Sequence, residues 1–140
     1  MNKILFLIFL FNSTLMFSNS PTDTIRNWQV YKDKILLLKS NETQTIKSCI
    51  INLENKFNKI SINVFSDIVR SSKGVVIQVI YKNKVIKRYF QQIKSNESFT
   101  IQYNEIISVL KNYKNKEVIL KYIDEYDEKG FEIGKIKIKS

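Results

Sequence analysis

Several residue types on which enzymes and metal sites depend are missing or scarce in this 140-residue chain. It contains no histidine, one cysteine and three glycines. Without histidine, the Ser-His-Asp and Cys-His nucleophile systems, imidazole-based zinc sites and the usual general base near neutral pH are excluded. One cysteine forms neither an internal disulfide nor a thiolate metal cage, and the glycines do not form a phosphate-binding loop. We therefore expect a protein with no catalytic site, no metal and no cofactor.

Alanine is also absent and proline occurs once, whereas isoleucine and asparagine are abundant, with 22 and 14 copies. The net charge is +10, and 20 of the 23 basic residues are lysine. A genome rich in A and T would produce this composition without selection for a basic surface. Arginine, which binds phosphate in a bidentate manner, is nearly absent, and the chain has no nucleic-acid-binding motif. We attribute the charge mainly to composition, and binding of an anionic partner is the alternative.

The first 20 residues have the pattern of a secretory signal peptide. Lys3 precedes an unbroken apolar run at 4–11, and small residues follow near position 20. The apolar segment is shorter than the roughly 20 residues that a membrane-spanning helix needs. We expect residues 1–20 to be cleaved and the remainder, 21–140, to form one exported domain, periplasmic or secreted, with no further transmembrane segment. A retained anchor or a buried core helix is the alternative.

After this segment, short runs with two-residue alternation of apolar side chains and many β-branched residues predict a series of strands. The spacing predicts an all-β fold, an antiparallel β-sandwich with an immunoglobulin-like Greek key of about seven to nine strands. The Cys-Trp-Cys spacing of immunoglobulin domains is absent, so the likeness is one of architecture alone. The predicted strands are 26–32, 34–39, 45–51, 59–66, 75–81, 85–92, 98–103, 117–123 and 131–138.

Two of these strands carry more detailed predictions. The segment 75–81 is apolar on both faces and is expected in the centre of a sheet, joined by a tight turn at Asn83 to the strand 85–92. The final strand, 131–138, has lysines on one face, which favours an exposed edge, and Gly134 breaks its alternation, which predicts a β-bulge. An exposed edge strand also offers two copies of the chain a route to a homodimer.

One segment breaks the strand pattern. Ile106, Ile107 and Leu110 recur at helical spacing, and Asn104 is a suitable N-cap. The pattern predicts a short crossover helix at about 104–113 that passes from one sheet to the other.

Two residues that often carry chemistry are expected in the core. Trp28 lies on the first predicted strand, where a lone tryptophan more often anchors packing than binds a ligand. Cys49 lies in the apolar run TIKSCII and is expected to be a small buried side chain, with a reactive or intermolecular thiol as the alternative.

The candidate ligand surface lies on the hairpin 81–90, where basic residues alternate with aromatic ones. Such a pattern binds anionic polymers, or an anionic lipid surface, by charge and stacking, although a solvent-facing hairpin in a lysine-rich protein looks the same. The residues of this predicted ligand surface are Lys82, Lys84, Lys87, Arg88 and Tyr89.

Acidic residues gather around the last hairpin, at 124–132. Their order does not match a calcium-binding loop, and a solvated turn is the expected interpretation. A small carboxylate-dependent hydrolase using Glu132 and Asp127 is the least favoured alternative, because it requires a cleft and one carboxyl group with a raised pKa. The favoured interpretation is an exported, non-catalytic binding or structural module that contacts an envelope or extracellular protein.

Overall fold

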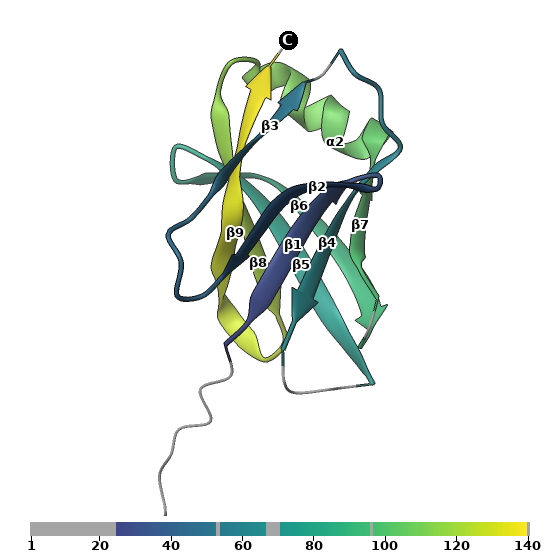
Figure 1. The fold of residues 1–140 in the computed structure, drawn as a ribbon, viewed down its shortest axis with the longest axis vertical. Helices are drawn as coiled ribbons and strands as arrows, with labels where there is room; N and C mark the ends of the chain where they lie inside the picture. Colours follow the sequence, from purple (N-terminus) through teal and green to yellow (C-terminus); the bar gives the residue numbers. More distant parts are fainter. Residues whose placement is uncertain (1–24, 53, 67–70, 96, 140) are drawn as a thin grey trace, which may run out of the picture.

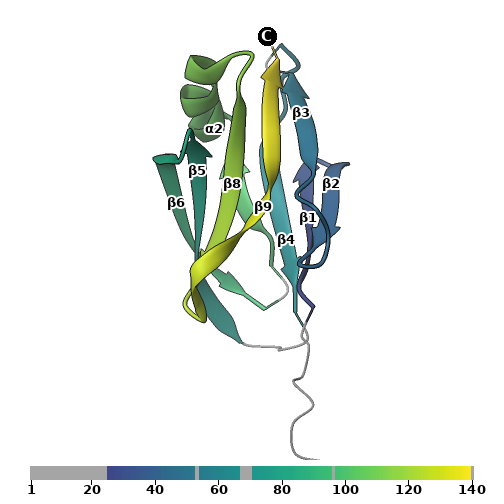
Figure 2. The same ribbon diagram turned by 90° about the vertical axis from the view of Figure 1, so that its left-hand side faces the viewer.

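A computed structural model describes residues 25–52, 54–66, 71–95 and 97–139, which form two β-sheets packed face to face with one short α-helix (Figures 1 and 2). The predicted all-β sandwich with a short helix is confirmed. The predicted signal peptide, 1–20, lies outside the described residues.

The first sheet has four strands in the order β2-β1-β4-β7, and every neighbouring pair is antiparallel. The first two strands form an antiparallel hairpin. The bounds are β1 (Asn27–Lys32), β2 (Ile35–Asn41), β4 (Lys59–Phe65) and β7 (Phe99–Gln102).

The second sheet has five strands in the order β3-β9-β8-β5-β6. Three of its pairs are antiparallel, but β3 runs parallel to β9, so the sandwich is mixed where the sequence predicts a purely antiparallel one. The bounds are β3 (Ser48–Asn52), β5 (Ser72–Tyr81), β6 (Lys84–Lys94), β8 (Glu117–Asp124) and β9 (Asp127–Lys139).

The β5–β6 hairpin confirms the predicted tight turn. Lys82 and Asn83 both have positive φ angles, 47° and 64°, which is the left-handed backbone that a two-residue hairpin turn requires. Strand β5 lies between β8 and β6, which confirms its predicted position inside a sheet.

The predicted position of the last strand is wrong. Strand β9 lies between β3 and β8 and is not an edge. Lys137 and Lys139 are exposed because they point away from the sandwich, while Ile136 and Ile138 point into it. A row of lysines shows only that one side of a strand faces water. An inner strand of a sheet with one solvated face has the same pattern, so the lysines do not identify an edge strand.

The predicted bulge is confirmed next to Gly134. Leu120 is opposite Gly134 while Lys121 is opposite Glu132, so Ile133 is the extra residue on β9.

The helix α2 (Tyr103–Leu110), followed by the 3₁₀ turn η2 (Lys111–Tyr113), connects β7 in one sheet to β8 in the other, as predicted. Its N-cap is Gln102 and not the predicted Asn104. The carboxylate of Glu105 accepts a hydrogen bond from the backbone N–H of Gln102 at 3.1 Å, which starts the helix directly at the end of β7.

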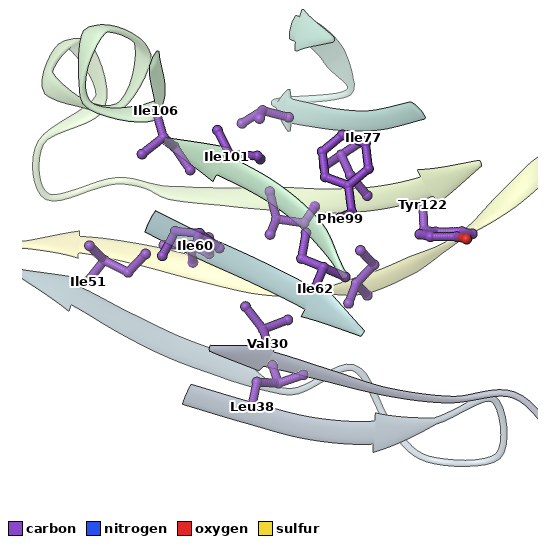
Figure 3. Packing of buried hydrophobic residues seen from close by; sticks show 14 of the residues in the cluster. Val30, Leu38, Ile51, Ile60, Ile62, Ile77, Phe99, Ile101, Ile106 and Tyr122 are labelled. Carbon is purple, nitrogen blue, oxygen red and sulfur yellow. The ribbon is translucent and has the colours of Figure 1, made fainter. Parts of the chain in front are cut away.

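The core fills the space between the sheets with aliphatic and aromatic side chains from both, and Ile106 of α2 closes one end (Figure 3). Trp28 is 4% exposed and Cys49 is 8% exposed, so both predicted core positions are confirmed. No helix in the described part of the chain has the length and apolar character needed to cross a membrane.

Candidate binding surfaces

The predicted ligand surface occupies β6, an edge strand, and the turn before it, and its strand residues point to opposite sides of the sheet. Tyr89 is opposite the buried Ile77 and faces the core side, whereas Arg88 is opposite Gln78 and faces outward. The Tyr89 hydroxyl donates a hydrogen bond to the carbonyl oxygen of Glu105 at 3.2 Å. Burial, with a smaller contribution from the nearby Glu105 charge, raises the pKa of the Tyr89 phenol to about 12. Tyr89 therefore links β6 to α2 and does not form one stacking surface with Arg88.

Lys87 lies on the same side of the sheet as Tyr89, because it is opposite Val79, and its ammonium nitrogen is 5.6 Å from the centre of the Tyr89 ring. Lys82 and Lys84 lie at the turn, away from Tyr89 along the strand. The five predicted residues thus divide among the turn, the outer side and the core side of the hairpin.

At the turn, the structure adds two residues that the sequence did not indicate. The Tyr81 ring lies 4.9 Å from the ring of Tyr113, measured between centres. The ammonium nitrogens of Lys82 and Lys116 lie 5.6 Å and 5.7 Å from the centre of the Tyr81 ring. Within the described ranges, neither lysine forms an ion pair with a carboxylate.

The outer face of the five-stranded sheet, which we define as the side directed away from the four-stranded sheet, carries a first apolar row. The register aligns Phe90 of β6 with Val76 of β5 and Ile123 of β8. The Phe90 side chain is 71% exposed, the highest exposure among the large hydrophobic residues of the described chain. It lies over Gly74, where an added Cβ would be 3.3 Å from the edge of its ring.

A second apolar row crosses the same face nearer to the turn. It consists of Val85, Ile80 and Ile119, and Val85 is 42% exposed. A polar row separates the two. It consists of Arg88, Gln78 and Lys121, and Glu132 of β9 lies beside Lys121.

The outer face of the four-stranded sheet has a different composition. Its central positions are amides and hydroxyls, while its lysines, Lys39 and Lys59, and two exposed apolar residues, Leu36 and Phe65, lie toward the margins. The central residues in register are Asn27, Gln29, Tyr31, Ser61 and Asn63. The centre of this outer face therefore carries no charged residue, unlike the polar row of the five-stranded sheet.

The acidic turn between β8 and β9 is held by its own backbone hydrogen bonds and by ion pairs with Lys73 and Arg26. Asp124 accepts backbone hydrogen bonds from Tyr126 and Asp127 at 3.1 Å and 3.0 Å, and its carboxylate lies 3.4 Å from the Lys73 ammonium. Asp127 accepts a 2.6 Å hydrogen bond from Arg26. This hydrogen bond lowers the pKa of the Asp127 carboxyl, the opposite of what a catalytic acid requires. Within the described residues, no three acidic or thiol side chains are grouped to hold a metal ion.

The chain matches no model of a known protein family, and it matches no curated protein sequence. Neither comparison assigns it to a family, and the surfaces described above are the features that bear on its function.

Proposed function

We propose that the protein is an exported, non-catalytic β-sandwich module that binds a protein partner of the cell envelope or extracellular space. The observation that carries this proposal is the pair of apolar rows on the outer face of the five-stranded sheet, with Phe90 exposed at its edge.

Apolar side chains gathered on the surface of a soluble domain mark contact sites, because their exposure to water is unfavourable unless a partner covers them. Aromatic residues, phenylalanine included, are also enriched in the buried centres of protein interfaces. Phe90 is a residue of this kind and Val85 adds exposed apolar area, while Arg88 and Lys121 lie between the rows, where they would select the partner by charge.

The strand order supports the finer proposal of an immunoglobulin-like arrangement. If β4 through β9 receive the letters B, C, C′, E, F and G, then β4 and β7 are neighbours as B and E are. The order β9-β8-β5-β6 then corresponds to G-F-C-C′, and β1 pairs with β4 as strand A pairs with B. Strands β2 and β3 are additions to that pattern.

The proposal that the protein is exported rests on the pattern of residues 1–20, which is that of a secretory signal peptide. Fractionation of the producing cells, with N-terminal sequencing of the recovered protein, tests it. We expect the protein outside the cytoplasm with an N-terminus near position 21, and a cytoplasmic protein that retains residues 1–20 would contradict export.

Substitution of Phe90 tests the binding surface. Phe90→Ser removes the exposed anchor, and Phe65→Ser is the matched control, because Phe65 is 52% exposed on the other sheet. A partner captured from envelope extract at high salt, where surface charge is screened, is then purified and titrated against all three proteins. We expect Phe90→Ser to weaken binding about thirtyfold, the effect of losing an interface hot spot, and Phe65→Ser to leave it unchanged. Equal binding by the two variants would overturn the assignment.

A further inference from the structure

We propose a second binding site, for a linear acidic polysaccharide, at one end of the five-stranded sheet. We call it the lysine-rich end and define it by six exposed lysines at the β5–β6 turn, in the segment just before β8 and at the end of β9. They are Lys82, Lys84, Lys114, Lys116, Lys137 and Lys139. This site is independent of the apolar rows proposed to bind a protein.

Three segments that are distant in sequence bring these lysines together. Because β5 is antiparallel to β8, the β5–β6 turn lies beside the segment that precedes β8, and Lys116 therefore reaches the Tyr81 ring. Two backbone hydrogen bonds then join this segment to the end of β9: Asn115 N–H donates to Ile138 O at 2.8 Å, and Ile138 N–H donates to Lys116 O at 3.0 Å. The backbone of the site is thus fixed by strand pairing.

The positive charge at this end is not neutralised by the described part of the chain. None of the six lysines forms an ion pair there. Glu117 lies opposite Lys137 in register, but its carboxylate is 3.6 Å from Lys135 and accepts a hydrogen bond from Ser48. Like charges held close together repel one another, and a bound polyanion relieves that repulsion.

Codon bias accounts for many lysines but not for their placement. A bias acting on the whole gene would place lysine on both outer faces alike. The four-stranded sheet instead presents amides and hydroxyls at the centre of its outer face, with Lys39 and Lys59 toward the margins. The lysine-rich end therefore differs in composition from the centre of that outer face.

The chemistry of the site favours carboxylate or sulfate groups on a sugar chain over a nucleic acid. Its cations are all lysines, which act as point charges and do not read phosphate or base edges in a bidentate manner. Tyr81 already contacts Tyr113 and two ammonium groups, so its ring offers no free platform on which a base could stack. A linear polyuronate requires only a row of positive charges at fixed positions.

Titration of the purified full chain with polygalacturonate tests the proposal, with uncharged dextran as the reference polymer. We expect affinity for polygalacturonate to fall steeply as salt is raised, and no binding of dextran. The double variant Lys82→Gln, Lys116→Gln should bind about tenfold more weakly at low salt and reduce the slope of log affinity against log salt by about 2. The control Lys39→Gln, Lys129→Gln removes the same charge elsewhere and should retain the affinity.

A second variant, Lys82→Arg with Lys116→Arg, keeps both charges and should bind as tightly as the unmodified chain. Equal weakening by the two glutamine variants would show that total charge alone attracts the polymer, and would overturn the site. Tighter binding of single-stranded DNA, or binding of anionic lipid vesicles without binding of polygalacturonate, would overturn the assignment to a polysaccharide. Affinity that is insensitive to salt would also contradict it.

Discussion

The indole nitrogen of Trp28 donates a hydrogen bond to the carbonyl oxygen of Ile133, 2.6 Å away. Trp28 lies on β1 of one sheet and Ile133 on β9 of the other, so the bond crosses the interior of the sandwich. Ile133 is the extra residue of the β9 bulge, which leaves it out of the pairing with β8. The only tryptophan of the chain thus satisfies a backbone acceptor that the bulge places in the core.

The variant Trp28→Phe keeps an aromatic ring in the core but removes the N–H donor. We expect it to lower the free energy of unfolding by about 2 to 3 kcal/mol, because the Ile133 carbonyl loses its partner and a cavity opens. Urea unfolding followed by circular dichroism measures the change. Tyr103→Phe is the control, since its hydroxyl makes no hydrogen bond with the described residues and its loss should cost less than about 0.5 kcal/mol.

Gly134, beside the bulge, lies close to Leu38 of β2 and to the backbone of Lys47, just before β3. A Cβ added there would lie 2.6 Å from Cδ1 of Leu38 and 3.1 Å from the carbonyl oxygen of Lys47. We expect Gly134→Ala to destabilise the fold by about 1 to 3 kcal/mol, because the buried Leu38 has little room to move. Gly74→Ala is the matched control: its Cβ would meet the exposed ring of Phe90, which is free to shift. Equal effects in thermal unfolding would show that crowding at the bulge is not the cause.

Much of the fold could be predicted from local sequence, because alternation reports which face of a strand is buried. The β5–β6 hairpin, the Gly134 bulge and the core positions of Trp28 and Cys49 all follow from such local signals. Sheet order does not, since pairing is decided between distant segments. The parallel pairing of β3 with β9 places the last strand inside the sheet, and no feature of residues 131–138 alone indicates it.

The same limit applies to the candidate sites. Alternation along 81–90 showed that basic and aromatic residues are mixed, but the structure separates Arg88 from Tyr89 because neighbouring strand residues point to opposite sides. Lys116 and Tyr113 reach Tyr81 only through the pairing of β5 with β8. The row formed by Phe90, Val76 and Ile123 likewise depends on the register of three strands.

The single thiol should be inert in the folded protein. Burial raises the pKa of Cys49 to about 11, so little of the reactive thiolate exists at pH 8. We expect a disulfide reagent such as Ellman's reagent to modify the native chain at pH 8 only at the rate of unfolding or local opening. In concentrated urea the same thiol should react at once. Rapid modification of the native protein would show that Cys49 is accessible and would restore the alternative of a reactive thiol.

The ion pair between Arg26 and Asp127 should make stability depend on pH in the acid range. Arg26 donates to one carboxylate oxygen of Asp127, and the Gly130 N–H donates to the other at 3.0 Å. These contacts lower the pKa of Asp127 below its unfolded value of about 3.9. The charged carboxylate therefore contributes fully to stability above that pH, and this contribution is lost as the pH falls through the native pKa.

We expect Asp127→Asn to lower the free energy of unfolding by about 1 kcal/mol at pH 7, near the upper end of the range measured for ion pairs with partial solvent access. Below pH 4 the loss should become progressively smaller. Urea unfolding at pH 7, 5 and 3 measures this, with the exposed Glu128→Gln as a control that should change little at any pH. A cost for Asp127→Asn that is the same at pH 7 and pH 3 would show that the side chain stabilises the turn by its shape and hydrogen bonding, and that its charge contributes nothing.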